Sequence, residues 1–334
     1  MKKRILVRGP ALTQSGYGEQ TRFALRALRT REDIFDIFLI PVSWGETGWI
    51  FEDTEEREWL DGLIMKHQAN TIEEKRPYDI SLQVTIPNEF ELLAPVNIGY
   101  TAGMETTKVA GEWIEKGNIM DRIIVVSNHS KEVYEGTSYT ATNQQTGEQQ
   151  GNYRLQVPVD VVNYPVRSLE KSKIDLDLEY DFNFLTIAQL SPRKNLKATL
   201  RWFVEEFIDQ EVGLVVKMNM KNNSLLDRER SIRKLKKFLR KYENRKCKVH
   251  LLHGDLSLEE MNALYTHPKI KCMISTTHGE GFGLPLFEAA YNGLPVLAPG
   301  WSGQCDFLYA PKKDKKGKKE RLRPHFAHVE YTIQ

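Results

Sequence analysis

The sequence predicts an α/β protein built from two doubly wound, Rossmann-like domains that face each other across a cleft. Three observations lead to this prediction. Short apolar runs alternate with helical runs in both halves of the 334-residue chain. Glycine-rich turns follow several apolar runs, and a charged stretch without clear periodicity, residues 165–181, separates the two series. We therefore expect an N-terminal domain over residues 1–165 and a C-terminal domain over residues 166–334.

The N-terminal half opens with a strand-like run at residues 4–8, a glycine turn and a helical run at residues 19–29. The turn holds Gly16-Tyr17-Gly18, for which tight-turn geometry and contact with a ligand are equal alternatives. Residues 136–152 are rich in Thr, Gln, Gly and Asn and have almost nothing to bury, which predicts a mobile loop. Further strands are expected at residues 34–42, 79–85, 97–101, 123–126 and 157–162.

The C-terminal half shows the same alternation. Apolar runs typical of buried strands occur at residues 182–188, 213–216, 248–252, 271–275 and 295–298. Helical runs separate them at residues 198–208, 225–242, 258–265 and 285–291. In such sheets, ligands bind outside the carboxyl ends of the strands, where Gly16, Lys194 and Glu280 are all expected to lie.

The segment 278–288 joins one of these strands to one of these helices and carries the strongest functional signal. It contains three glycines, then Pro285 at the expected first turn of a helix that ends near Asn292-Gly293. Glu280 lies in the loop and Glu288 lies one turn into the helix. Free amides at a helix start suit an anion, and carboxylates suit sugar hydroxyl groups.

Two cations, Arg193 and Lys194, follow another strand of the same predicted sheet. Cationic side chains, a helix N-terminus and glycine amides at one sheet edge suit a diphosphate, while the two carboxylates suit a sugar or a ribose. This combination predicts a nucleotide sugar as ligand.

The segment Glu280–Glu288 resembles the Glu-x7-Glu motif of retaining glycosyltransferases of family 4, which have the GT-B fold. Residues 100–105, 113–115, 121–127 and 298–307 are also similar to segments of that family. The resemblance implies a metal-independent hexosyltransferase that uses a nucleoside diphosphate sugar as donor and needs no cofactor. Its acceptor would be a saccharide or a lipid-linked saccharide.

The resemblance also implies roles for single residues. Glu288 would accept hydrogen bonds from the ribose, and Glu280 would hold a hydroxyl of the transferred hexose. Lys194 matches the lysine that binds the diphosphate. The family usually has an arginine where this chain has Gln189, and Arg193 would supply that charge. Backbone amides of Gly281, Phe282, Gly283 and Leu284 would hold the sugar and phosphate.

In the N-terminal domain, the resemblance implies that Gly16, Tyr17 and Gly18 close on the phosphates. Glu105 is expected at a strand end, either as a substrate contact or as a local hydrogen-bonding residue. Family members commonly retain the anomeric configuration by a front-face substitution, in which the leaving phosphate accepts the proton of the acceptor.

The amino-acid composition argues against several other functional classes. The formal net charge is only +2, so no general attraction to nucleic acid or acidic lipid is expected. Three scattered cysteines indicate reduced thiols and a cytoplasmic protein, and we expect no metal site. No apolar run approaches the ~20 residues needed to cross a bilayer. The strand-like last residues predict a C-terminal domain that is truncated.

Basic segments leave alternatives open. The helical run at residues 228–241 is expected to present a solvated basic face, with peripheral membrane contact as the less favoured interpretation. Residues 312–319 are expected to form an exposed loop. The rival functions are a DNA-modifying sugar transferase, a hydrolase using Glu280 and Glu288 as an acid and base pair, and a non-catalytic binding module for sugar nucleotides.

Overall fold

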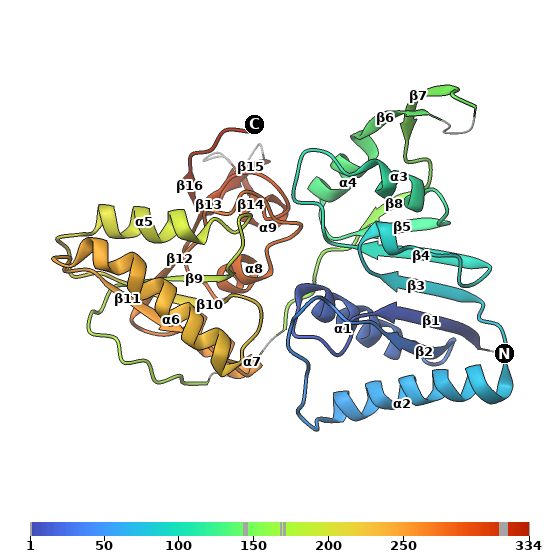
Figure 1. The fold of residues 1–334 in the computed structure, drawn as a ribbon, viewed down its shortest axis with the longest axis horizontal. Helices are drawn as coiled ribbons and strands as arrows, with labels where there is room; N and C mark the ends of the chain where they lie inside the picture. The colour runs from blue at the N-terminus through green and yellow to red at the C-terminus, as the bar shows by residue number, and fades with distance from the viewer. Residues whose placement is uncertain (1, 143–145, 168, 170–171, 314–319, 334) are drawn as a thin grey trace. The chain divides into compact units, whose positions relative to one another are not determined.

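The structure is a computed structural model that describes residues 2–142, 146–167, 169, 172–313 and 320–333. The chain forms two compact units, Met1–Pro165 and Val166–Gln334. Each unit contains one six-stranded sheet whose strand pairs are all parallel (Figure 1). The predicted α/β class with two doubly wound sheets is therefore confirmed.

The first unit has the strand order β2-β1-β3-β4-β5-β8. The chain leaves β1 toward β2 on one side and returns to β3 on the other, so the order reverses between β1 and β3. Its parallel strands are β1 (Lys3–Gly9), β2 (Phe35–Pro41), β3 (Ile80–Val84), β4 (Val96–Thr101), β5 (Arg122–Val125) and β8 (Val159–Val161). Its helices are α1 (Gly16–Arg29), α2 (Glu55–Ala69), α3 (Gly111–Gly117) and α4 (Asn128–Gly136), with one turn of π-helix (Asn70–Glu74) and one of 3₁₀ helix (Pro87–Glu89).

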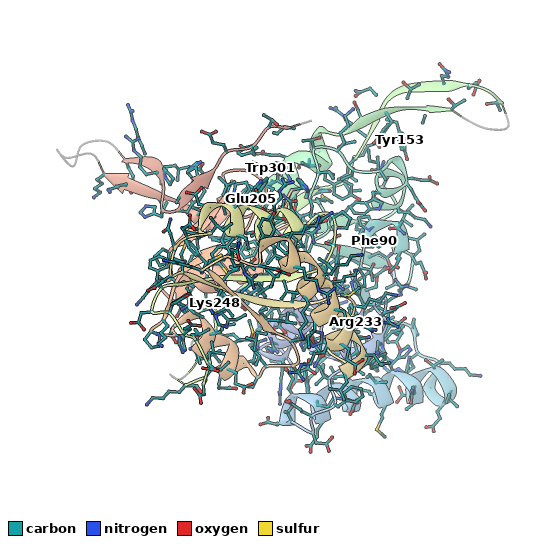
Figure 2. All side chains as sticks on the ribbon, turned by 60° about the vertical axis from the view of Figure 1, so that its left-hand side comes forward. Phe90, Tyr153, Glu205, Arg233, Lys248 and Trp301 are labelled. Atoms are coloured by element: carbon teal, nitrogen blue, oxygen red, sulfur yellow. The ribbon has the colours of Figure 1, made fainter. Side chains whose placement is uncertain are left out.

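Burial explains why the strands of the first unit form long apolar runs. Ile5, Leu6 and Val7 are successive residues of β1 and all are buried, because helices cover both faces of a parallel sheet. Phe90, labelled in Figure 2, is fully buried and packs with Ile114 and Tyr134 on the α3 and α4 side. The predicted strands of this half are confirmed.

The polar segment 136–152 does not form the loop expected from its composition. Most of it pairs as an antiparallel hairpin of β6 (Ser138–Thr142) and β7 (Gln149–Arg154). The hairpin is anchored where Tyr139 donates a hydrogen bond to the carbonyl of Val109 (2.6 Å). Cross-strand backbone bonds therefore order residues that have little apolar surface to bury, and residues 143–145 lie outside the described residues.

The second unit has the strand order β11-β10-β9-β12-β13-β16, with the reversal between β9 and β12. This is the order of a dinucleotide-binding Rossmann sheet. Its parallel strands are β9 (Asn183–Gln189), β10 (Gly213–Asn219), β11 (Lys248–Leu252), β12 (Ile270–Ile274), β13 (Val296–Pro299) and β16 (Ala327–Val329). Its helices are α5 (Leu196–Glu206), α6 (Leu225–Leu239), α7 (Leu258–Tyr265), α8 (Leu284–Tyr291) and α9 (Cys305–Leu308), with a 3₁₀ turn (Arg240–Tyr242) after α6.

Two apolar clusters place the helices of the second unit on opposite faces of the sheet. Leu214 and Val216 of β10 pack with α5 and α6. Val215, between them, packs with α7 and α8. This alternation is the two-residue period of a strand, and it means that both faces of the sheet are covered. The predicted strands and helices of this half are confirmed to within a few residues.

The basic segment at residues 312–319 departs from its prediction in the part that the structure describes. Lys312 and Lys313, expected in an exposed loop, belong to β14 (Tyr309–Lys313), which pairs with β15 (Glu320–Pro324) as an exposed hairpin. Residues 314–319 lie outside the described residues. The described residues of the charged stretch 165–181 contain no helix or strand.

Candidate functional site

The candidate site of the second unit lies where the strand order reverses. Arg193 and Lys194 are in the loop after β9, and Glu280 is in the loop after β12. Because β9 and β12 are neighbours in the sheet, their carboxyl ends bring the two loops together. Ligands of doubly wound sheets bind at this position. The fold thus joins residues that are 86 positions apart.

Glu280 is the buried centre of an ion-pair cluster whose two cations are partly exposed. Its exposed fraction is only 7%. Lys194 Nζ lies 2.6 and 2.7 Å from its two carboxylate oxygens, and Arg193 Nη1 lies 3.1 Å from Oε2. Arg193 also donates to the carbonyl of Gly279 (2.8 Å). Lys194, expected to bind a diphosphate, is therefore held by Glu280 in this structure.

The charge state of Glu280 results from two opposing effects. Burial raises the pKa of its carboxyl group, because a buried anion loses its hydration. The positive charges of Lys194 and Arg193 outweigh burial, and the pKa lies below the ordinary value of 4.5. Glu280 is thus an anion at neutral pH, fixed between two cations.

The backbone of the Glu280 loop is held by a third loop, which follows β13. Ser302 Oγ accepts a hydrogen bond from the Glu280 amide (3.0 Å), and the Gly303 amide donates to the Glu280 carbonyl (2.8 Å). A Cβ atom on Gly303 would lie 1.9 Å from the Gly281 carbonyl oxygen. Only glycine therefore allows the two loops to approach this closely.

The predicted helix start after Glu280 is confirmed as the first turn of α8. Gly283 precedes the helix with φ of +92°, a conformation that favours glycine, and Pro285 lies in the first turn. The side chain of Phe282 is buried against Phe287 and Phe307, with ring centroids 5.1 Å away in each case. Residues 281–284 can therefore offer backbone amides to a ligand, whereas the Phe282 ring belongs to the core.

Glu288 lies on α8 in a different environment from Glu280. The hydroxyl of Tyr265 donates to its carboxylate (2.7 Å). Burial raises the pKa of Glu288 above its ordinary value, and the Tyr265 hydrogen bond and the charge of Arg167 only partly offset this effect. The pKa values of Glu280 and Glu288 are thus shifted in opposite directions, because only Glu280 has two cations against it.

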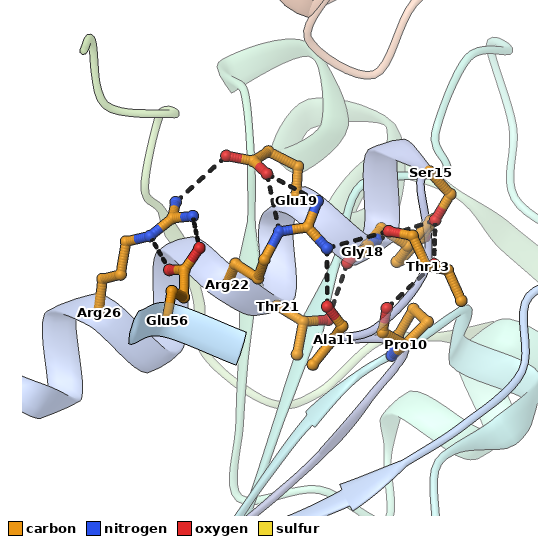
Figure 3. A network of polar contacts seen from close by, with 11 residues as sticks. Pro10, Ala11, Thr13, Ser15, Gly18, Glu19, Thr21, Arg22, Arg26 and Glu56 are labelled. Carbon is orange, nitrogen blue, oxygen red and sulfur yellow. Dashed lines mark hydrogen bonds and ion pairs between the residues drawn. The ribbon is translucent and has the colours of Figure 1, made fainter. Parts of the chain in front are cut away.

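In the first unit, the Gly16-Tyr17-Gly18 segment is not part of the loop after β1 but the first turn of α1. Ser15 caps that turn by accepting a hydrogen bond from the Gly18 amide (2.9 Å). Arg22 holds the preceding loop by donating to the carbonyls of Ala11 (2.7 Å) and Thr13 (2.9 Å), as Figure 3 shows. A Cβ atom on Gly18 would lie 2.1 Å from the Thr13 carbonyl oxygen, so close packing of the loop requires this glycine.

The other residues of this segment differ from Gly18. Gly16 is exposed, and a Cβ atom there would meet no atom within 4 Å. Tyr17 is buried, and its hydroxyl bonds with Thr101 Oγ1 (2.8 Å) and accepts from the Ala102 amide (3.1 Å). Burial raises the pKa of Tyr17 to about 12, and the negative charge of nearby Glu105 adds to this rise. Glu105 therefore lies near α1, at the carboxyl end of β4.

Sequence reasoning assigned no role to several residues that shape the site. Ser302 and Gly303 lie in the segment 298–307, whose resemblance to the family was the only signal available. No sequence pattern pointed to Tyr265, which ends a predicted helix, or to Arg167, which lies in the charged stretch. Gln189, the departure from the family pattern, is exposed at the end of β9.

Among the residues that the structure describes, no group of three or more His, Cys, Asp and Glu side chains could hold a metal ion. None of the described helices combines the length and the apolar character that a bilayer crossing needs.

Comparison with known proteins tests the fold. HepE of Anabaena, solved with UDP and glucose, has a TM-score of 0.54 at 13% identity, over 91% of this chain and 82% of that chain. Sucrose-phosphate synthase of Thermosynechococcus elongatus has a TM-score of 0.56 at 14% identity, over 90% and 82%. The lipopolysaccharide outer core galactosyltransferase WaaB has a TM-score of 0.53 at 11% identity, over 90% and 81%. The chain has the GT-B fold.

The GT-B fold agrees with a match in sequence. Residues 170–309 match the family model of glycosyl transferases group 1, within the second unit and including the whole Glu280 cluster. A comparison with curated proteins finds no match. The matched domain and the GT-B fold together support sugar transfer as the chemistry of this chain.

Proposed function

We propose that this chain is a retaining, metal-independent hexosyltransferase of glycosyltransferase family 4. It would move a hexose from a nucleoside diphosphate sugar to a saccharide or a lipid-linked acceptor. The glycosyl transferases group 1 match and the GT-B fold support sugar transfer, and HepE, a protein of the same fold, was solved with UDP and glucose. The cytoplasmic location indicated by the cysteines stays a prediction.

The observation that carries the proposal is the cluster of Glu280, Lys194 and Arg193 at the reversal point of the second sheet. Burying a carboxylate costs desolvation free energy that its ion pairs offset only in part, so the cluster is better explained by a role in binding or catalysis than by stability alone. When the donor binds, its diphosphate would compete with Glu280 for Lys194. The carboxylate released in this way would accept a hydrogen bond from a hexose hydroxyl.

The same cations suit the chemistry of transfer. The bond between the hexose and the phosphate oxygen breaks, and the leaving diphosphate gains negative charge. Lys194 and Arg193 would stabilise that charge more strongly in the transition state than in the ground state, which accelerates the step. The leaving oxygen would accept the proton of the acceptor hydroxyl as this hydroxyl attacks the same face, so the anomeric configuration is retained.

The remaining site residues have proposed roles of the same kind. Glu288, oriented by Tyr265, would accept hydrogen bonds from the ribose. Backbone amides of residues 281–284 would hold the sugar and phosphate. In the first unit, the exposed first turn of α1 at Gly16 would contact the phosphates, and Glu105 would face the acceptor.

A thermal-shift screen against UDP, GDP and ADP sugars tests the donor. A donor at a hundred times its Kd should raise the free energy of unfolding by ~2.7 kcal/mol. NMR of the products formed with the best donor then gives the anomeric configuration. An inverted product would contradict the retaining mechanism. Tight donor binding without even slow donor hydrolysis would instead indicate a non-catalytic binding module.

A further inference from the structure

Helix α6 and its following turn carry a strongly cationic surface among the described residues of the second unit, and nothing in the proposed reaction uses it. In residues 225–242, all of them described, eight exposed side chains are Lys or Arg and one exposed side chain, Glu229, is acidic. Arg233, labelled in Figure 2, lies near the middle of this surface. We call these exposed residues the α6 surface. The whole chain has a formal net charge of only +2, so this charge is local.

The cations of the α6 surface repel one another. None of the eight forms an ion pair with any residue that the structure describes. Arg230 and Lys234, and likewise Arg233 and Lys237, are four positions apart on one helix, where like charges destabilise it. The helix is nevertheless held firmly, because its opposite face buries Leu235 in the core of the unit. Such a surface is therefore suited to an anionic partner.

Two leucines at the start of α6 narrow the choice of partner. Leu225 is 76% exposed and Leu226 is 67% exposed, so two neighbouring apolar side chains meet solvent beside these cations. The phosphate backbone of a nucleic acid would use the cations but gains little from leucines beside them. A lipid bilayer uses both, since leucines enter the acyl boundary while cations meet the headgroups.

We propose that the α6 surface docks the chain on an anionic lipid bilayer, with Leu225 and Leu226 inserted into the interface. Helix α6 follows β10, so its first residues lie at the carboxyl edge of the sheet, the edge that also carries Glu280. Docking would bring that edge close to the membrane. If the proposed function holds, this location favours a lipid-linked acceptor over a free saccharide.

The test measures co-sedimentation of the full chain with vesicles of phosphatidylcholine, and with vesicles of equal parts phosphatidylcholine and phosphatidylglycerol. We expect binding to the anionic vesicles only, weakened by added salt. The triple variant Arg230→Gln, Arg233→Gln and Lys237→Gln should lower the partition coefficient about a hundredfold, since each cation near an anionic surface contributes several-fold. The double variant Leu225→Ala and Leu226→Ala should lower the partition coefficient by at least about tenfold at unchanged charge, because six carbon atoms that enter the interface are removed.

A control variant changes the same amount of charge elsewhere on the unit. Lys312, Arg321 and Arg323 of the exposed β14–β15 hairpin are replaced by Gln, and vesicle binding should persist. Binding lost in this variant but kept in the α6 variant would overturn the proposal. So would undiminished binding of the leucine variant, or binding to a DNA duplex without binding to anionic vesicles. None of these measurements depends on sugar transfer, so they can fail independently of the proposed function.

Discussion

Replacing Lys194 with alanine tests the chemistry of the site most directly. Lys194 Nζ lies 2.6 and 2.7 Å from the oxygens of Glu280, so the change removes the closest cation of the cluster. A hydrogen bond to a charged group contributes about 1.5–3 kcal/mol. If that contribution is made to the leaving diphosphate in the transition state, kcat falls about ten- to 150-fold.

The variant also changes the stability of the site, and the assay must separate the two effects. Without Lys194, only Arg193 opposes the effect of burial, and the pKa of Glu280 is expected to rise. The carboxyl group can then take up a proton, which limits the loss of stability. We therefore propose to measure kcat well below the midpoint of thermal unfolding of the variant.

Lys197→Ala is the matched control, because Lys197 is an exposed lysine three positions further on, in α5. Its kcat should equal that of the wild type. A Lys194→Ala variant that is folded, binds the donor and has an undiminished kcat would refute the role of this lysine in the transition state. A loss confined to KM would show that Lys194 helps ground-state binding only.

Three further predictions concern stability and can be checked by urea unfolding. Glu280→Gln should lower the free energy of unfolding at neutral pH. The difference from the wild type should shrink as the pH falls below 4.5, because the folded-state pKa of this carboxyl group lies lower and its stabilisation is lost on protonation. A difference that grows in acid would contradict this prediction. Gly303→Ala should lower the free energy of unfolding by about 1–3 kcal/mol, since its Cβ would lie 1.9 Å from the Gly281 carbonyl oxygen. The control Gly62→Ala in α2, whose Cβ would meet nothing within 4 Å, should raise it by about 0.5–1 kcal/mol. Equal effects would be inconsistent with the close packing at Gly303. Asp227→Asn should lower the free energy of unfolding by about 2 kcal/mol at neutral pH. Burial raises the pKa of Asp227, but hydrogen bonds from backbone amides and His253 outweigh burial and lower the pKa from 3.8 to about 2. The difference should disappear as the pH falls from 3.8 to about 2, and an unchanged difference at low pH would contradict the prediction.

Most of the fold could be predicted from the sequence because its elements are locally encoded. The buried strands are apolar runs, and α8 has a glycine before it, Pro285 in its first turn and Gly293 with φ of +75° after it. These signals act over a few residues, so they are legible without the tertiary structure. The hairpin β6–β7 was missed for the opposite reason, since cross-strand hydrogen bonds order it although its composition suggests a loop.

The residues of the candidate site could also be predicted only in part. The sequence identified Glu280, Glu288, Arg193 and Lys194, because strand ends followed by glycines and charged residues indicate the ligand edge of a parallel sheet. It placed Gly16-Tyr17-Gly18 wrongly in a loop. Helix α1 begins three residues earlier than predicted, because the side chain of Ser15 caps it by accepting a hydrogen bond from the Gly18 amide.

By itself, the sequence determined the order of most strands of the two sheets, the two series they form and the residue types at the ends of those strands. Only the tertiary structure decided which of those residues meet. It placed β9 beside β12, and that pairing brings Lys194 within 2.6 Å of Glu280 and lowers the pKa of this glutamate, while Tyr265 faces Glu288. The physical reason is that the apolar pattern of a buried strand or a helix is set by neighbours along the chain, whereas the charge state of a buried carboxylate depends on neighbours in space.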